Sequence, residues 1–499
     1  MHKRPSAASL LLGLIVAGYL LAATLYAVYT PAWQVPDEPA HYNYVRFLVE
    51  ERRFPVLAAG DYPHDYLEQI KARRFPPDMS IAPIRYEFHQ PPLYYILAAG
   101  VYALVAGAGL ATQVVALRLL SVFIGVWLLP VTYVIVLQVL PGRRDLALGA
   151  AAFVAFIPMH LTFSAGINND GLAELLMAVA LLLLLRHLSW RARSAAPTPA
   201  GRLLGLGLVM GLLMLTKSSV YLALPLVCLG LTWSEWRAGR LPAALRANAL
   251  VFGPALLLAT PWFMRNSLTY GGLDLLGLGR HDAVVVGQLR TADWLAQLGP
   301  RAAASAFLRT TFQSFWAQFG WMGVPIDSRL YVLLGLCSAL LALGALLAGW
   351  RLWRGRQGLT ATQWAGLALL ALLLLFTVAS YAWYNLQFVQ PQGRYLFRGL
   401  IPLGLLAAAG LRRLLTRRGA WTAASALAGV CLALLALGLA RGDLPLLWLV
   451  ATAGLAAAFA LRAALLPERA GAPLMTLPYA GLWTFALLCL FEYVVPYLT

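Results

Sequence analysis

Charged side chains are scarce in this sequence. Only 12% of its 499 residues are Asp, Glu, Lys or Arg, whereas 61% are hydrophobic. Soluble domains carry about 25% charged residues, so an ordinary soluble globular protein is excluded. Apolar runs of about 20 residues, the length that crosses the hydrocarbon core of a bilayer, recur along the chain. These features predict an all-α polytopic membrane protein.

Cysteines and acidic residues are also few. The 20 acidic residues stand against 38 basic ones, and nine of the acids fall between Asp37 and Glu87. The basic residues form short clusters between apolar runs, which is the positive-inside pattern of membrane proteins rather than the basic face that binds nucleic acid. All four cysteines lie inside apolar runs, which excludes a disulfide framework and a thiolate metal site. They are Cys228, Cys337, Cys431 and Cys489.

The arginine clusters predict the topology. When every cluster is placed in the cytoplasm, the N-terminus is cytoplasmic, the C-terminus is outside and thirteen spans result. The predicted spans are 9–30, 116–140, 146–164, 171–188, 203–216, 219–234, 247–262, 328–350, 361–381, 398–415, 421–440, 444–463 and 476–497. Residues 91–110 are apolar enough to span, but a span there would place every later arginine cluster on the outer side of the membrane. We therefore interpret them as a helix in the outer interface, where tyrosines are favoured.

The external loop 31–90 carries the strongest chemical signal. Asp37 and Glu38 lie between Pro36 and Pro39, which restrict the backbone on both sides. Partial desolvation near the headgroups would raise the pKa of a carboxylate and make it a better base. Alternatively, Asp37 caps an interfacial helix that starts near Pro39. A cap explains one acid but not an adjacent pair with His41, so we favour catalytic roles for both acids.

A second polar motif, Asn168-Asn169-Asp170, lies at the outer end of the third predicted span. It either caps the fourth span or faces the same cavity as the first loop. Because the first loop lies on that side, we favour a catalytic role for Asp170 and a substrate contact for Asn169. One turn deeper, Glu174 is an intramembrane acid that needs a partner.

Two further groups are candidates for substrate binding. His41, His89 and Gln90 belong to the first loop, and the histidines with the nearby acids could hold a divalent metal. Their spacing matches no compact metal motif, so no metal or other cofactor is predicted. The second group consists of cations at outer span ends, which either snorkel to lipid headgroups or bind a lipid-linked phosphate. These residues are Lys217, Arg265 and Arg394, the last followed by Tyr395.

Taken in order, the Asp37-Glu38 pair, the Pro-Pro-Leu-Tyr-Tyr helix at 91–95, the Asn-Asn-Asp turn and the Gln-Gly-Arg-Tyr loop resemble the GT-C superfamily of membrane glycosyltransferases. Within that superfamily, the sequence resembles the branch that includes protein O-mannosyltransferases and aminoarabinose transferases. The resemblance implies a catalytic transmembrane domain over residues 1–400, including loop 31–90 and interfacial helix 91–110. Residues 401–499 would add C-terminal transmembrane helices. One departure is Gln90, where relatives often carry a lysine.

The resemblance also implies a function. An inverting glycosyltransferase would move a sugar from a polyprenyl-phosphate donor to a lipid, glycan or protein acceptor at the external or periplasmic face of the cell membrane. Asp37 would be the general base, Asp170 would orient the acceptor or the base, and outer arginines would hold the phosphate. One alternative is a non-catalytic, lipid-binding relative that kept the fold, and the main alternative is a transporter or flippase. The latter is disfavoured because the spans are almost free of acids and the polar motifs gather on one side.

Overall fold

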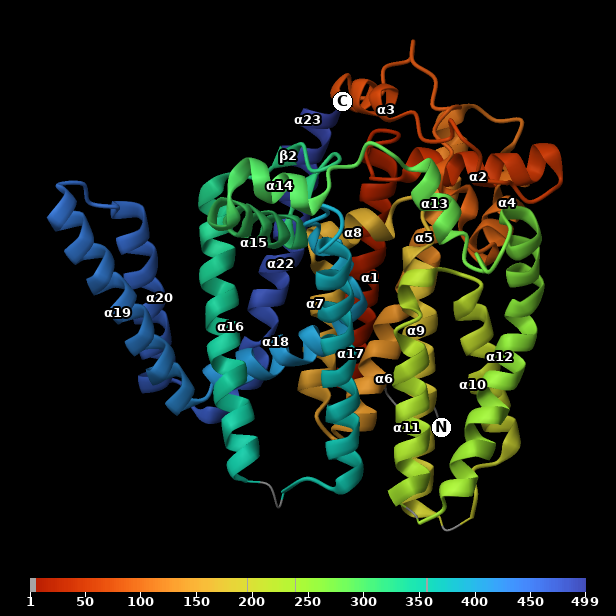
Figure 1. Cartoon of the computed structure of the whole chain (residues 1–499). Coiled ribbons are helices and arrows are strands. Elements are labelled where there is room, and N and C mark those ends of the chain that lie inside the picture. The colour runs from red at the N-terminus through yellow and green to blue at the C-terminus, as the bar shows by residue number, and fades with distance from the viewer. Residues whose placement is uncertain (1–5, 195, 238, 356–357) are drawn as a thin grey trace.

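The computed structural model describes residues 6–194, 196–237, 239–355 and 358–499. It is a helical bundle covered at one end by short helices and loops (Figure 1). Among the described residues, ten helices are long and apolar enough to cross a membrane. They are α1 (Ala7–Tyr29), α5 (Leu110–Val126) continued by α6 (Leu128–Val139), α9 (Asp170–Arg193), α12 (Leu241–Tyr270), α16 (Ser328–Arg354), α17 (Ala361–Asn385), η4 (Gly393–Gly399) continued by α18 (Leu400–Leu414), α19 (Arg417–Arg441), α20 (Leu446–Leu465), and α22 (Thr476–Cys489) continued by η6 (Leu490–Val494) and α23 (Val495–Leu498).

The all-α polytopic architecture is confirmed, but the count of thirteen spans is not. Each predicted segment contains a helix, yet three of these segments do not form a straight span. Residues 146–164 form α7 (Arg144–Phe156) and α8 (Pro158–Ser164), which meet at 67° and would make an eleventh span if counted as one. The other two, α10 (Ala200–Met214) and α11 (Ala223–Arg237), have 15 residues each, below the roughly 20 that a span needs.

Short elements form the covering layer. Among them, α4 (Leu93–Val105) has 13 residues, which at about 1.5 Å per residue is shorter than a bilayer core, and its interfacial position stays a prediction. It packs against α2 and α5. The remaining elements of this layer are α2 (Glu38–Glu51), α3 (His64–Ala72), η1 (Tyr86–His89), η2 (Ser218–Val220), α13 (Leu278–Val284), α14 (Thr291–Leu298), α15 (Pro300–Trp316), β1 (Gln318–Phe319) and β2 (Val324–Pro325). The short helices η5 (Glu468–Ala470) and α21 (Gly471–Leu474) lie at the other end of the bundle, where the Arg417 backbone N–H donates to Oε1 of Glu468.

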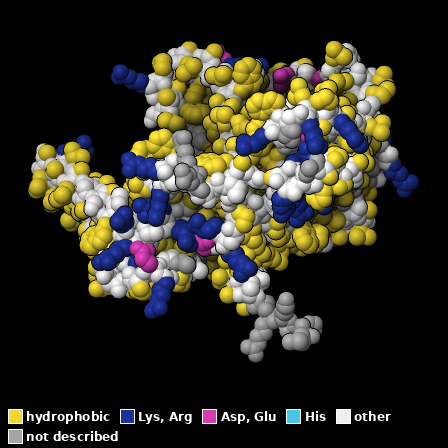
Figure 2. Space-filling view, turned by 90° about the horizontal axis from the view of Figure 1, so that it is seen from below, with side chains coloured by type: hydrophobic (Ala, Val, Ile, Leu, Met, Phe, Trp, Pro, Cys, Tyr) yellow, Lys and Arg dark blue, Asp and Glu magenta, His cyan; other side chains and the backbone are white. Residues whose placement is uncertain are grey.

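The two ends of the bundle differ in charge. The C-terminus lies in the covering layer, where Arg74 of the first loop donates a hydrogen bond to the backbone oxygen of Thr499 at 3.5 Å. The opposite end carries many Lys and Arg side chains and few acidic ones (Figure 2). The arginine clusters and the first loop therefore lie at opposite ends of the bundle, as the positive-inside pattern requires.

Candidate active site

Asp37 occupies a strained position at the start of α2. Its φ of 69° lies in the left-handed region, which is uncommon for a residue with a side chain. It stands at the N-cap of α2, but its carboxylate makes no capping hydrogen bond. Instead, Oδ1 accepts a hydrogen bond from the Tyr86 hydroxyl at 2.8 Å, and Oδ2 pairs with Nη2 of Arg394 at 2.7 Å. The backbone is thus held in a conformation that turns the acid toward other loops.

The surroundings of Asp37 determine its charge. Burial alone would raise its pKa, but chiefly the charge of Arg394, together with the hydrogen bond from Tyr86, lowers the pKa to about 2. The predicted rise in pKa is therefore wrong. The carboxylate is ionised at neutral pH, and it can act as an effective base only once Arg394 is drawn away from it.

The loop that carries Arg394 is fixed by close packing. Gly393 donates a backbone hydrogen bond to the Ser314 hydroxyl at 2.7 Å, and a Cβ atom at Gly393 would overlap the backbone of Phe315. The guanidinium of Arg394 lies over the Phe163 ring, 4.7 Å from its centroid, and its Nε atom is buried without a hydrogen-bond partner among the described residues. One donor of this arginine is therefore available to a ligand.

Asp170 joins the site from α9. Its Oδ1 pairs with Nζ of Lys217 at 2.7 Å, and it lies within electrostatic reach of Arg394 and His41. The preceding Asn169 donates to the Thr216 backbone oxygen at 3.1 Å. Four residues predicted from separate segments thus form a row of alternating charge. They are Asp37, Arg394, Asp170 and Lys217.

The two candidate histidines are buried beside this row. Nδ1 of His41 lies 2.8 Å from the Tyr95 hydroxyl, and burial lowers the His41 pKa below its ordinary value. His89 places Nδ1 3.0 Å from the backbone oxygen of Tyr86; burial, then the neighbouring His281, lowers its pKa to about 3. Both rings are neutral at physiological pH and can serve as hydrogen-bonding groups.

Gln90 links the first loop to the Asn169 turn. Its backbone oxygen accepts from the Tyr44 hydroxyl at 3.1 Å, and its Oε1 accepts from the Asn169 amide at 3.4 Å. In the part of the chain that the structure describes, no group of three His, Cys, Asp or Glu side chains is placed to hold a metal ion.

A cavity of about 290 Å³ opens next to the Asp37–Arg394 pair. Asp37, Arg394 and Tyr395 line it, whereas Asp170 and Lys217 are not among its lining residues. Several other lining residues escaped the sequence analysis: Tyr62, Glu68, Tyr86, Glu87, Trp321, Tyr384 and Gln392. Gln392 opens the Gln-Gly-Arg-Tyr motif but was not singled out in it, and Tyr86 and Glu87 stand within three residues of His89. Membership of these segments was the available signal. Trp321 carries no comparable signal.

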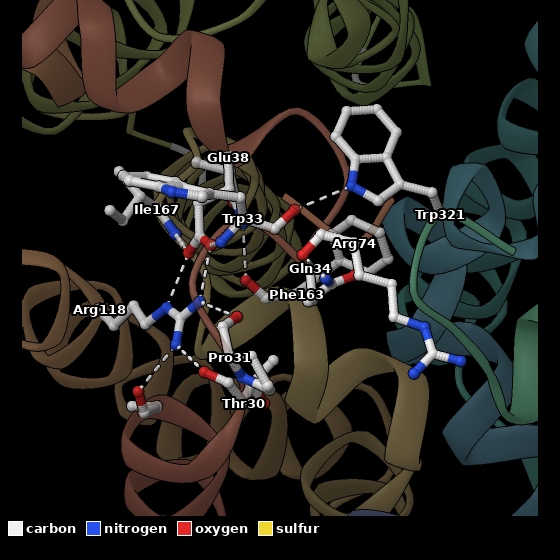
Figure 3. Close-up of polar contacts among 12 residues, drawn as sticks. Thr30, Pro31, Trp33, Gln34, Glu38, Arg74, Arg118, Phe163, Ile167 and Trp321 are labelled. Carbon is white, nitrogen blue, oxygen red and sulfur yellow. Dashed lines mark hydrogen bonds and ion pairs between the residues drawn. The ribbon is translucent and has the colours of Figure 1, made fainter. Parts of the chain in front are cut away.

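Glu38 is not among the residues that line the cavity, and its carboxylate faces Arg118 (Figure 3). Its Oε1 and Oε2 accept from Nε and Nη2 of Arg118 at 2.7 and 2.6 Å, and they also accept from the backbone N–H groups of Ile167 and Trp33. Both side chains are buried: the exposed fraction is 0% for Glu38 and 1% for Arg118. Arg118 also donates to three backbone carbonyls at the end of α1, those of Ala27, Thr30 and Pro31.

This environment indicates that Glu38 joins α1, α2, α5 and the turn before α9. We infer a structural role for Glu38 from these contacts, and its predicted catalytic role stays a prediction. Arg118 was missed by the sequence analysis, although a lone arginine inside an apolar run is itself a signal of a buried partner.

Arg265 also lies apart from the site. It donates to the backbone oxygen of Pro55 and, at 2.9 Å, to the side chain of Asn266, while its guanidinium covers the Trp262 ring. Its observed role is to fasten the first loop to α12. Of the three outer cations, Lys217 and Arg394 therefore both lie close to Asp170, whereas Arg265 lies elsewhere.

If Asp37 acts as a base, the fall of that activity at acid pH should depend on Arg394. Because the pKa of Asp37 in the folded protein lies below its ordinary 3.8, the ion pair adds stability above about pH 4 that is lost as the pH falls toward 2. We expect that kcat/KM of the wild type does not fall through protonation of Asp37 between about pH 7 and 4. In Arg394→Gln, burial raises the pKa of Asp37 without the opposing effect of the Arg394 charge. We therefore expect kcat/KM of this variant to fall as the pH decreases between about pH 7 and 4. The same pH dependence of kcat/KM in both proteins would show that Arg394 does not determine the ionisation of Asp37.

Known structures resemble this one. ArnT from Cupriavidus metallidurans in the apo state is 16% identical with a TM-score of 0.53, and the match covers 98% of this chain and 78% of that chain. The same protein bound to undecaprenyl phosphate gives a TM-score of 0.50 at 16% identity, covering 96% and 76%. The Archaeoglobus fulgidus oligosaccharyltransferase tethered with an acceptor peptide gives 0.50 at 12% identity, covering 93% of this chain and 55% of that one. This chain thus spans about half of the oligosaccharyltransferase.

These structures belong to the GT-C superfamily, so the predicted resemblance is confirmed for the fold. A search of curated proteins gives no match. Residues 73–403, well over half of the chain, match the family described as "Predicted membrane protein (DUF2142)". The match includes the Asn-Asn-Asp turn and the Gln-Gly-Arg-Tyr loop, while Asp37 lies before it. The protein therefore belongs to the DUF2142 family of membrane proteins, built on the GT-C fold.

Proposed function

We propose that this protein is an inverting glycosyltransferase that takes its sugar from a polyprenyl-phosphate carrier and passes it to a hydroxyl acceptor. The observation that carries the proposal is the 2.7 Å pair between Asp37 and Arg394 beside a polar cavity. A carboxylate can accept the proton of an acceptor, and a guanidinium can hold a phosphate through two parallel hydrogen bonds. The complex of ArnT with undecaprenyl phosphate supports a carrier lipid of this class.

The proposed reaction is a single displacement. The acceptor oxygen attacks the anomeric carbon as Asp37 takes its proton, and the bond from that carbon to the phosphate oxygen breaks on the opposite face. The electron pair leaves with the phosphate, whose growing negative charge Arg394 stabilises. Unlike the retaining glycosidases, this route needs no covalent sugar–enzyme intermediate.

Arg394 would also couple donor binding to the activity of the base. A phosphate that draws Arg394 away from Asp37 removes the charge that chiefly lowers the pKa of this carboxylate. Burial then raises that pKa, so Asp37 becomes a stronger base when the donor is in place. In the unliganded protein the carboxylate stays neutralised by its ion pair.

The proposal can be tested with the purified full-length protein in liposomes that contain polyprenyl-phosphate-linked sugars labelled in the sugar. We expect free polyprenyl phosphate to accumulate, together with labelled product when an acceptor fraction of the cell envelope is added. Movement of intact donor between leaflets without cleavage would instead support the flippase alternative. If neither cleavage nor transfer occurs with any donor of the panel, the proposed reaction is wrong.

We infer that the cavity faces the outside and that the arginine-rich end faces the cytoplasm. Exposed positions at the two ends allow a test in a variant without cysteines. In intact cells, Glu51→Cys should react with a membrane-impermeant maleimide, whereas Arg418→Cys should react only after permeabilisation. The reverse pattern would invert the orientation and place the site in the cytoplasm.

A further inference from the structure

Within the described residues, one carboxylate of the cavity wall forms no ion pair. Asp37 is paired with Arg394 at 2.7 Å, and Glu68 is paired with Lys71 at 2.5 Å. Glu87 lines the same cavity, yet among the described residues it forms no ion pair. Its Oε2 atom is buried and lacks a hydrogen-bond partner within the described part of the chain. Oε2 of Glu87 is therefore a strong hydrogen-bond acceptor, in a residue of the cavity wall, that receives no hydrogen bond from the described residues.

A second unused acceptor comes from the loop before α18. The amide nitrogen of Gln392 donates to Oε1 of Gln390 at 2.7 Å, which fixes the orientation of the Gln392 amide. Its own Oε1 is buried and, within the described residues, has no donor. Both Gln390 and Gln392 line the cavity. Two loops far apart in the sequence thus each supply an unsatisfied oxygen.

Aromatic rings complete the wall. Tyr62, Tyr86, Trp321 and Tyr384 line the cavity together with these acceptors. Flat rings suit the C–H faces of a sugar, while carboxylate and amide oxygens accept hydrogen bonds from its hydroxyl groups. A buried acceptor without a donor is costly, so a ligand that brings donors is favoured. The volume of about 290 Å³ lies at the low end for small-molecule sites, which suits one sugar unit.

We propose that Glu87 and Gln392 form the subsite for the hydroxyl groups of the transferred sugar. The inference rests on the proposed function and adds the residues that would select the sugar. Glu87 follows Tyr86, which hydrogen-bonds Asp37, and Gln392 stands two residues before Arg394. The backbone segments that hold the base and the phosphate-binding arginine therefore also hold the sugar-binding groups.

Free monosaccharides provide a direct probe. We expect at least one of D-glucose, D-galactose, D-mannose and L-arabinose, at millimolar concentrations, to give saturation-transfer NMR signals with the full-length protein in detergent. Glu87→Gln should weaken that binding by about tenfold, because hydrogen bonds to a charged acceptor are the stronger ones. Glu68→Gln is the matched control, because it removes a carboxylate of the same cavity wall that already forms an ion pair with Lys71. Its effect should stay below about twofold.

Thermal unfolding separates a binding role from a structural one. Because Oε2 of Glu87 makes no internal hydrogen bond among the described residues, Glu87→Gln should melt no lower than the wild type without ligand. A lower melting temperature would assign Glu87 to folding instead. Absence of sugar binding to the wild type, or equal weakening by Glu87→Gln and Glu68→Gln, would also overturn the subsite.

The liposome assay keeps this inference distinct from the proposed function. If the wild type cleaves a donor and Glu87→Gln keeps the same KM and donor preference, the subsite is wrong and the function stands. If free sugars bind through Glu87 but no polyprenyl-phosphate donor is cleaved, the subsite stands and the proposed function is wrong.

Discussion

Replacing Asp37 with Asn should reduce the initial rate of sugar transfer by about 10²–10⁴-fold, the usual contribution of a general base. Asparagine keeps the size of the side chain and can still accept a hydrogen bond from Tyr86, but it cannot take up the acceptor proton. The expected loss lies in kcat, measured as release of polyprenyl phosphate in liposomes at saturating donor. Donor binding should persist, because Arg394 becomes more available to the phosphate.

Asp78→Asn provides the control for this loop. Asp78 belongs to the same external segment, is 63% exposed and pairs with Arg73 on the surface. Its substitution should leave the rate unchanged, since exposed ion pairs contribute little. A wild-type rate in Asp37→Asn would remove Asp37 from the chemistry.

The second large effect is expected on stability. Glu38→Gln leaves Arg118 as an uncompensated charge in a sealed environment, so folding should lose about 3–5 kcal/mol. We expect a much lower melting temperature in detergent and a smaller yield of folded protein. Within the same helix, Glu50→Gln disrupts only the exposed pair with Arg46 and should cost less than about 1 kcal/mol.

This comparison also decides between two roles for Glu38. If Glu38→Gln were as stable as the wild type but inactive, the acid would be catalytic, as the sequence first suggested. If it is unstable and the folded fraction keeps its specific activity, the ion pair with Arg118 is structural. The geometry in Figure 3 predicts the second result.

Much of the fold could be predicted from the sequence. Apolar runs and arginine clusters locate the helices because both follow from the solvent that each segment meets. The count of thirteen spans is not confirmed, because hydropathy does not register where a helix breaks. Ile157 and Pro158 bend one segment, and the turn around Lys217 separates two helices of 15 residues.

The candidate site was less predictable, because it depends on contacts between distant segments. Asp37 and Arg394 each belong to a recognisable motif, but only the fold places them 2.7 Å apart. That contact reverses the predicted sign of the Asp37 pKa shift. Adjacent residues also diverge: Asp37 faces the cavity, whereas Glu38 faces Arg118. Their different directions at the start of α2 cannot be read from an Asp-Glu pair.

The most direct measurement is an experimental structure of the protein with undecaprenyl phosphate bound. Our account predicts that the phosphate lies within hydrogen-bonding distance of Arg394, roughly 3 Å, and that the ion pair of Arg394 with Asp37 has opened. It also predicts that the freed Asp37 carboxylate faces the cavity lined by Glu87 and Gln392. A phosphate bound elsewhere, with the Asp37–Arg394 pair intact, would contradict the account.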